Sequence, residues 1–126
     1  MDIGTLVTVT DHEAGAEYRL RSPVDGKPTD VYITIKGADS LEWRKQKRIQ
    51  TNTIVKAREQ KKGDIDYDAL DVDALVAVTT SWRGIAKDGA EWPCTPENVR
   101  YLYENSPRIV AQLLGFISDS ANFTKG

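Results

Sequence analysis

The chain has 126 residues, of which 40% are apolar and 29% charged, and its formal net charge is −2. This length suits one domain over residues 1–126, and the near-neutral charge argues against a surface that binds nucleic acid or membranes throughout. The apolar runs are only a few residues long, so the sequence predicts no segment that spans a bilayer and no secretion signal. A single cysteine, Cys94, and a single histidine, His12, exclude an internal disulfide and a zinc site with four Cys or His ligands.

Residues 1–37 are predicted to be mainly β. Residues 5–10 contain the β-branched stretch "LVTV", and apolar residues alternate with polar ones on both sides of the turn-rich "SPVDGKP" within residues 16–36. Alternation of this kind is typical of strands, and Asp25-Gly26 favours a turn between them. We therefore expect a β-hairpin with a loop longer than two residues, in a small antiparallel sheet.

A long basic helix is predicted to follow, and residues 38–126 are expected to be mainly α. The stretch from Leu41 to Lys62 has no Pro or Gly and contains eight Lys or Arg residues against two Glu. Asp39 or Ser40 supplies the N-terminal cap. Apolar residues are sparse along this stretch, so we expect a mostly solvated helix with a narrow packing stripe.

The charge changes sign after Gly63. Five aspartates lie between Asp64 and Asp73 with no basic residue among them, which suits the first turns of a helix. Apolar residues then recur at three- and four-residue steps as far as Trp82 and Ile85. This spacing predicts one helix over residues 67–85.

Two further helix starts close the chain. Thr95-Pro96-Glu97 and Ser106-Pro107 each place a capping residue before a proline, so we expect a short helix over 96–105 and a last helix over 107–119. Gly115 in the last helix is expected to allow close packing, and the tail is expected to fray unless Phe123 folds back. The fold class is α+β: an N-terminal β-hairpin or small antiparallel sheet, a long basic helix, and a C-terminal helical cluster with a helix–turn–helix corner over 81–107.

The sequence offers little catalytic chemistry. His12 has no second catalytic group anchored nearby, so a solvated loop histidine is expected, and Cys94 is expected to be structural. The five aspartates lack the glycine and the terminal glutamate of a calcium loop, and no glycine-rich phosphate loop is present. We therefore expect no catalytic residue, cofactor or metal, which favours a binding or assembly protein over an enzyme.

The basic helix raises the question of nucleic acid. Its eight positive residues between 44 and 62 could meet phosphates, so an accessory protein that binds nucleic acid through residues 44–62 is one alternative. The positive residues surround the helix, however, and the acidic segment after it compensates their charge. A solvated face or a protein contact is therefore favoured, and the two patches of opposite sign also suit head-to-tail self-association.

The C-terminal half combines a tryptophan at the end of an expected helix, a glycine turn, a helix after a Thr-Pro-Glu-Asn start, a proline-led final helix and Asn-Phe near the end. The segments that carry this pattern are "ALVAVTTSWRGI" (74–85), "AKDGAEWPCT" (86–95), "TPENVRYLYENSPRIVAQL" (95–113) and "FISDSANF" (116–123). In this pattern the chain resembles the tail assembly chaperones of long-tailed (siphovirus-type) bacteriophages. N-terminally, "YRLRSPVDGKPTDVYITIKGADS" is similar to the opening strands of that family.

The resemblance implies a non-enzymatic role in the cytoplasm of the host bacterium. Such proteins bind the tape measure protein, keep it soluble, help to recruit tail tube subunits and are absent from the finished particle. A second alternative is a small structural head–tail or tail component retained in the virion. A chaperone of this kind needs aromatic contacts and complementary charge. For the aromatic candidates, a place in the core or as cover of the hairpin is favoured over partner binding. The candidates for partner binding are Trp43, Arg44, Lys47, Arg48, Trp92, Tyr101 and Tyr103.

Overall fold

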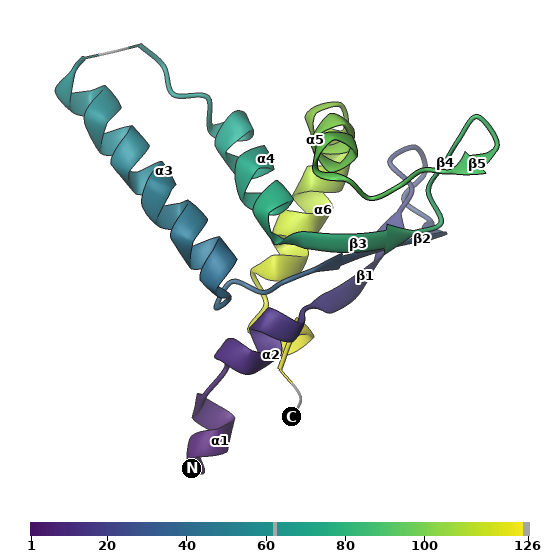
Figure 1. The fold of residues 1–126 in the computed structure, drawn as a ribbon, viewed down its shortest axis with the longest axis horizontal. Helices are drawn as coiled ribbons and strands as arrows, with labels where there is room; N and C mark the ends of the chain where they lie inside the picture. Colours follow the sequence, from purple (N-terminus) through teal and green to yellow (C-terminus); the bar gives the residue numbers. More distant parts are fainter. Residues whose placement is uncertain (62, 125–126) are drawn as a thin grey trace.

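The computed structural model describes residues 1–61 and 63–124, and it has the expected α+β fold (Figure 1). Three antiparallel strands form one sheet in the order β1–β2–β3, and β4 and β5 form a separate short hairpin. Helices α4, α5 and α6 lie on one side of the sheet, and α3 lies beside α4 (Figure 1). The elements are α1 (Ile3–Leu6), α2 (Val9–Ala14), β1 (Ala16–Arg21), β2 (Pro28–Ile35), α3 (Leu41–Glu59), α4 (Tyr67–Val78), β3 (Thr79–Arg83), β4 (Ala86–Lys87), β5 (Ala90–Glu91), α5 (Pro96–Glu104), α6 (Pro107–Ile117) and the 3-10 helix η1 (Ser120–Asn122).

The predicted hairpin is confirmed as β1 and β2. Tyr18 pairs with Ile33 across the two strands, and the loop between them is longer than two residues. It is closed by a hydrogen bond of 2.8 Å from the Ser22 N–H to the Lys27 carbonyl. Gly26 has a φ of 74°, a conformation that glycine adopts without steric cost. Turn chemistry close in sequence therefore fixes this part of the sheet.

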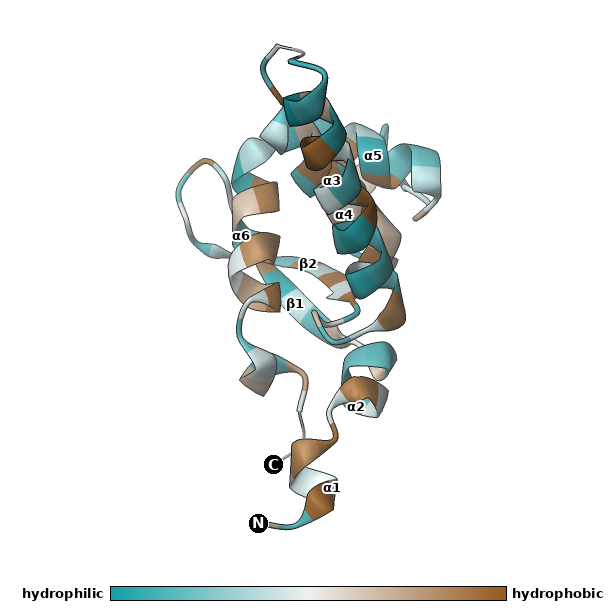
Figure 2. Ribbon diagram, turned by 90° about the vertical axis from the view of Figure 1, so that its left-hand side faces the viewer, coloured by the Kyte–Doolittle hydropathy of each residue, from teal (hydrophilic) through white to brown (hydrophobic). Residues whose placement is uncertain are grey.

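The expected β structure in residues 5–10 is wrong, because this segment spans the end of α1 and the start of α2. Asp2 accepts a 2.8 Å hydrogen bond from the Gly4 N–H at the start of α1. Val7 and Val9 are 56% and 41% exposed, so their β-branched side chains do not pack on a neighbouring surface as they would in a sheet. Strand preference comes largely from packing on a half-buried sheet, which is missing here. Figure 2 shows hydrophobic residues on α1, which stands apart from helices α3 to α6.

The helix predicted over 67–85 is also wrong in its second half. Helix α4 ends at Val78, and the chain continues as β3, in which Trp82 pairs with Ile33 of β2. The hydroxyl of Thr79 donates a 2.7 Å hydrogen bond to the Leu75 carbonyl as the helix ends, which is a local side-chain alternative to the helical ladder. The corner expected over 81–107 is consequently a strand, a hairpin and then a helix.

The elements after β3 follow the predicted turns and caps in part. Asp88 and Gly89 have φ values of 53° and 81°, as a two-residue hairpin turn requires. Thr95 caps α5 by accepting a 3.2 Å hydrogen bond from the Asn98 N–H, as expected. Ser106, by contrast, makes no side-chain capping bond at α6. The expected close packing at Gly115 is wrong, since this glycine is exposed and a Cβ there would have no atom within 4 Å.

One hydrophobic core joins the sheet to the helices. Ile33 and Ile35 of β2 and Leu75 of α4 are fully buried in it, and α6 contributes Leu113. Phe123 folds back, with 4% of its surface exposed, and its ring centroid lies 5.3 Å from that of Phe116. The segment up to Thr124 is therefore tied to the core instead of fraying.

His12 is buried, which corrects the expectation of a solvated loop histidine. Its side chain is 1% exposed, and its ring stacks on Phe123 at a centroid distance of 5.1 Å. The Asp39 N–H donates to Nδ1 over 2.9 Å, and Nε2 lies 3.0 Å from the Ser120 hydroxyl. Because Ser120 and Phe123 are more than a hundred residues away along the chain, no local pattern around His12 could predict this packing.

Candidate functional site

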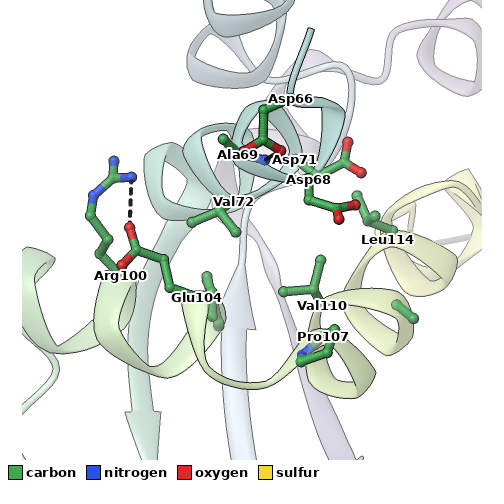
Figure 3. Close-up of a pocket in the computed structure, with 12 residues that line it drawn as sticks. Asp66, Asp68, Ala69, Asp71, Val72, Arg100, Glu104, Pro107, Val110 and Leu114 are labelled. Carbon is green, nitrogen blue, oxygen red and sulfur yellow. Dashed lines mark hydrogen bonds and ion pairs between the residues drawn. The ribbon is translucent and has the colours of Figure 1, made fainter. Parts of the chain in front are cut away.

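A groove lies between α4, α5 and α6. Its volume is about 580 Å³, and side chains of all three helices line it (Figure 3). Val72 and Val110 point into the space from opposite helices and are 6% and 9% exposed. Ala69 and Ala111 are small residues on the two sides, and Leu114 is half-buried at one end. The floor and sides of the groove are therefore mostly apolar.

Acidic side chains surround this groove. The charged residues that line it are Asp66, Asp68, Asp71 and Glu104, together with one cation, Arg100. Arg100 is already held by Asp73 at 2.7 Å and lies 3.8 Å from Glu104, as the dashed line in Figure 3 marks. Asp68 and Asp71 form no ion pair with any residue that the structure describes. The edge of the groove therefore carries an excess of negative charge.

The acidic edge follows from how α4 begins. Asp66 is the N-cap, and its carboxylate accepts a 3.0 Å hydrogen bond from the Ala69 N–H. Asp68 lies in the first turn, where a negative charge interacts favourably with the positive end of the helix dipole. The aspartates thus decorate a helix N-terminus, as the sequence indicated. What the sequence did not indicate is that α6 lies opposite them and turns this end of α4 into one wall of a groove.

Four of the predicted partner-binding residues come together at the start of α3. A shallow depression of about 390 Å³ is lined by Trp43, Arg44, Lys47 and Arg48, with Thr51 and Asn52. Trp43 is 9% exposed, and the ammonium of Lys47 lies 4.7 Å from the centroid of its ring. Trp43 is therefore mostly a core residue covered by Lys47, while Arg44 and Arg48 present their charge to solvent. Lys62, the last basic residue of the predicted helix, lies outside the described residues.

Trp92 and Tyr101 form a second group, near the β4–β5 hairpin. The half-buried ring of Trp92 stacks on Trp82 at 5.4 Å, and Tyr101 meets Trp92 edge-on at 6.0 Å. The indole N–H of Trp82 donates a 2.7 Å hydrogen bond to the Trp92 carbonyl. Tyr101 is 61% exposed, so it is the one aromatic residue among the predicted partner-binding set with a largely free ring.

Tyr103 lies in the core and not on a surface. It is 1% exposed, and its hydroxyl is 2.7 Å from that of Thr79. Because the Thr79 hydroxyl donates its hydrogen to the Leu75 carbonyl, the Tyr103 hydroxyl is the donor in this pair. Burial raises the pKa of Tyr103 well above its ordinary value, since the phenolate would lose its hydration. Tyr103 contributes to the lining of the groove, and its contact with Thr79 anchors α5 to the end of α4.

The contact between His12 and Ser120 invites comparison with a catalytic Ser–His pair. In such a pair, the histidine nitrogen facing the serine must be free to accept its proton. Here the Asp39 N–H already donates to Nδ1, so neutral His12 carries its hydrogen on Nε2 and donates toward Ser120. This tautomer is the wrong one for a general base. The pair serves to hold α2 against η1.

Residues 1–61 and 63–124 contain neither a reactive thiol nor a group of metal-binding side chains. Cys94 is half-buried, and burial raises the pKa of its thiol. The protonated thiol, which is less nucleophilic than the thiolate, is therefore favoured. Across residues 1–61 and 63–124, no three His, Cys, Asp or Glu side chains are grouped so as to hold a metal ion. In the same residues, no helix combines the length and the apolar character needed to cross a bilayer.

Comparisons with known proteins give no relative from which a function could be transferred. No family model, curated protein or solved structure matches the chain. Membership in the tail assembly chaperones therefore stays a prediction that rests on the residues in which the resemblance was seen. The groove and the basic start of α3 are the two candidate binding surfaces.

Proposed function

We propose that this protein is a non-enzymatic tail assembly chaperone of a long-tailed bacteriophage. It binds the tape measure protein, keeps it soluble and helps to recruit tail tube subunits around it. It acts in the cytoplasm of the host bacterium and does not remain in the finished particle. The proposal starts from the resemblance in residues 74–123 and gains support from the surfaces of the molecule.

The groove between α4, α5 and α6 is the observation that carries the proposal. A chaperone for a long helical protein must cover apolar side chains that would otherwise aggregate, and it must release them later. An open apolar floor with a charged edge suits this task, because the floor supplies burial and the edge sets orientation. Val72 and Val110 supply the floor, and the aspartates at the start of α4 supply the edge.

Co-expression with the tape measure protein of the same phage or prophage tests the proposal. With an affinity tag on this chain, we expect a soluble complex that survives purification, and we expect the tape measure protein to be insoluble when it is expressed alone. Failure of the two proteins to co-purify from cells that contain both would contradict the proposal. A tagged unrelated protein of similar size and charge is the control for non-specific capture.

Analysis of finished particles separates the chaperone from a structural tail component. We expect mass spectrometry of purified virions to detect tube and tape measure proteins but not this chain. Its presence at a fixed ratio to the tube protein would favour the alternative of a head–tail or tail component that is retained in the virion.

The nucleic-acid alternative depends on the start of α3, where Arg44 and Arg48 are exposed beside Trp43. A titration with labelled DNA at two salt concentrations tests it, because phosphate contacts weaken steeply as salt rises. We expect no binding even at low salt. Salt-sensitive binding that is lost in Arg44→Glu/Arg48→Glu would favour this alternative over the chaperone.

A further inference from the structure

We propose that the groove between α4, α5 and α6 binds one amphipathic helix of a partner protein, and that this helix carries Lys or Arg on both flanks of its apolar stripe. The inference rests on the proposed function in one respect, namely that the helix belongs to the protein which the chaperone keeps soluble. It adds the surface and the chemistry of recognition, which the proposed function does not specify.

The shape of the groove suits a helix. Two of its walls are helices, α4 and α6, and the exposed residues Ala69 and Ala111 on these walls are small enough to leave the space between them open. A helix that lies in such a groove presents apolar side chains three or four residues apart, which point in the same direction. Val72, Val110 and Leu114 offer aliphatic contacts to such side chains along the groove. The volume of about 580 Å³ can take several large aliphatic side chains.

The charge of the edge selects the flanks of the partner helix. The lining has four carboxylates and one guanidinium, and that guanidinium is engaged by Asp73 at 2.7 Å. A helix with acidic flanks would bring like charges together, whereas Lys or Arg on its flanks would meet Asp68 and Asp71. These two aspartates form no ion pair with a described residue, so they can accept a partner cation without losing an existing one.

Helix α3 of a second copy fits the groove less well than a partner helix. It is basic, but its exposed large apolar residues are Leu41, Ile49 and Val55, and none of these is three or four residues from another. It therefore lacks two adjacent apolar side chains on its outer face. The exposed face of α3 would bring charge into the groove without filling the floor.

Helix α1 of a second copy fails for the opposite reason. Ile3, Leu6 and Val7 are exposed and have the spacing of one apolar face. The segment around them carries Asp2 and Asp11 and no Lys or Arg, so it would face the aspartates of α4 with like charge. The combination that the groove demands, an apolar stripe with basic flanks, points to another protein.

A synthetic peptide tests the inference with the full chain. The probe is a fluorescein-labelled helix with leucines at i, i+3, i+4 and i+7 spacing and lysines on both flanks. Its matched control has the same leucines with glutamates in place of the lysines. In fluorescence anisotropy, we expect the lysine peptide to bind and the glutamate peptide to bind at least about tenfold more weakly. Equal binding of the two peptides would overturn the proposal.

Two variants locate the binding. Ala111→Trp fills the groove from an exposed position of α6, and Asp68→Asn/Asp71→Asn removes charge while leaving the helix cap at Asp66. We expect each to weaken binding of the lysine peptide by about tenfold or more. The matched control, Asp25→Asn/Asp88→Asn, removes the same charge from two hairpin loops, and it should bind as the wild type does. If both groove variants bind like the wild type, the inference is wrong; if one of them does not fold, the other still decides.

Co-purification separates failure of this inference from failure of the proposed function. A tape measure protein that co-purifies equally with the wild type and with Ala111→Trp would overturn the inference and leave the function standing. Groove-dependent peptide binding without any tape measure complex would support the inference and contradict the function. A concentration-dependent dimer in light scattering that disappears in Ala111→Trp would show a second copy in the groove, and it would overturn the choice of a partner helix.

Discussion

Helices α3 and α6 belong to the same domain but are stabilised in different ways. Helix α6 is 11 residues long and buries Ile109, Val110, Leu113 and Ile117 against the rest of the molecule. Helix α3 has 19 residues, all of them described, yet its buried side chains are those of Trp43 and Gln50. The longer helix therefore contributes fewer buried side chains to the core.

The difference shows what each helix depends on. Helix α3 depends on local signals: Ser40 caps it by accepting from the Trp43 N–H, and its sequence has good helix formers without Pro or Gly. Helix α6 has no side-chain capping bond at Ser106 and an exposed glycine inside, so its stability comes largely from burial. A helix held mainly by local signals leaves its outer face free to carry charge, as the exposed Arg44 and Arg48 do.

The largest effect on stability is expected in the hydrophobic core between the sheet and the helices. Trp82→Ala should lower the free energy of unfolding by about 3–5 kcal/mol, because it removes a buried indole that stacks on Trp92 and donates to its carbonyl. Urea denaturation followed by circular dichroism measures this. Trp82→Phe is the matched control and should cost less. An unchanged denaturation midpoint in the alanine variant would contradict the burial of Trp82.

A matched pair of truncations compares the two helices directly. Leu113→Ala in α6 should cost about 2–5 kcal/mol, because the side chain is fully buried and leaves a cavity. Val55→Ala in α3 should change stability by less than about 0.5 kcal/mol, because this side chain is 44% exposed. Equal losses in the two variants would show that α3 packs more tightly than its burial indicates.

The buried hydroxyl of Tyr103 should make stability fall at high pH. Burial raises the pKa of Tyr103 in the folded chain above its unfolded value of about 10, so the unfolded state releases the proton first. The stabilising contribution is complete below pH 10 and declines above it, by up to about 1.4 kcal/mol per pH unit. Denaturation of the wild type and of Tyr103→Phe between pH 8 and pH 11 isolates this term, since the variant lacks the titrating group.

The exposed Tyr101 supplies the control for that measurement. Tyr101 is 61% exposed, so the stability of Tyr101→Phe should vary with pH as that of the wild type does. If Tyr103→Phe keeps the full alkaline loss of stability, another group must be responsible and the assignment to Tyr103 is wrong.

A smaller effect than that of Leu113→Ala is expected where α3 meets α4. Gln50 is 6% exposed, and its side-chain amide donates a 2.6 Å hydrogen bond to the Leu70 carbonyl. Gln50→Ala should cost about 1 kcal/mol, the usual net value of one hydrogen bond. Hydrogen exchange should show faster exchange in α3 and little change in α6. Uniform acceleration across both helices would contradict the idea that α3 is held separately.

The parts of the fold that were predictable depend on residues close together in the chain. The hairpin around Asp25-Gly26, the Ser40 cap and the start of α5 at Pro96 all follow from signals a few residues long. The change from α4 to β3 did not, because Val78 and Trp82 are four residues apart and this spacing fits a helix. Strand β3 forms because it can pair with the edge of β2, at Ile33 and Ile35. These residues lie in a distant part of the chain, so the local sequence does not indicate the pairing.

The candidate binding surfaces also differ in how far the sequence predicts them. Arg44, Lys47 and Arg48 could be grouped from sequence, because residues three and four apart share a helix face. The groove could not be predicted, since Asp68 and Leu114 come together only when α6 lies against α4. The acidic residues at the start of α4 were recognised, but their place on one wall of a groove depends on tertiary structure.

The closeness of Gly37 to His12 constrains how this protein can change by mutation. Gly37 is buried, and a Cβ at that position would overlap Nδ1 of His12, so no side chain is tolerated there while the histidine is in place. The two positions can therefore vary only in one order, with His12 replaced by a smaller residue first. Gly37→Ala should consequently be far more costly in the wild type than in a His12→Ala background. A mutational path that begins at Gly37 is closed, and one that begins at His12 must first give up the contacts that join the two ends of the described chain.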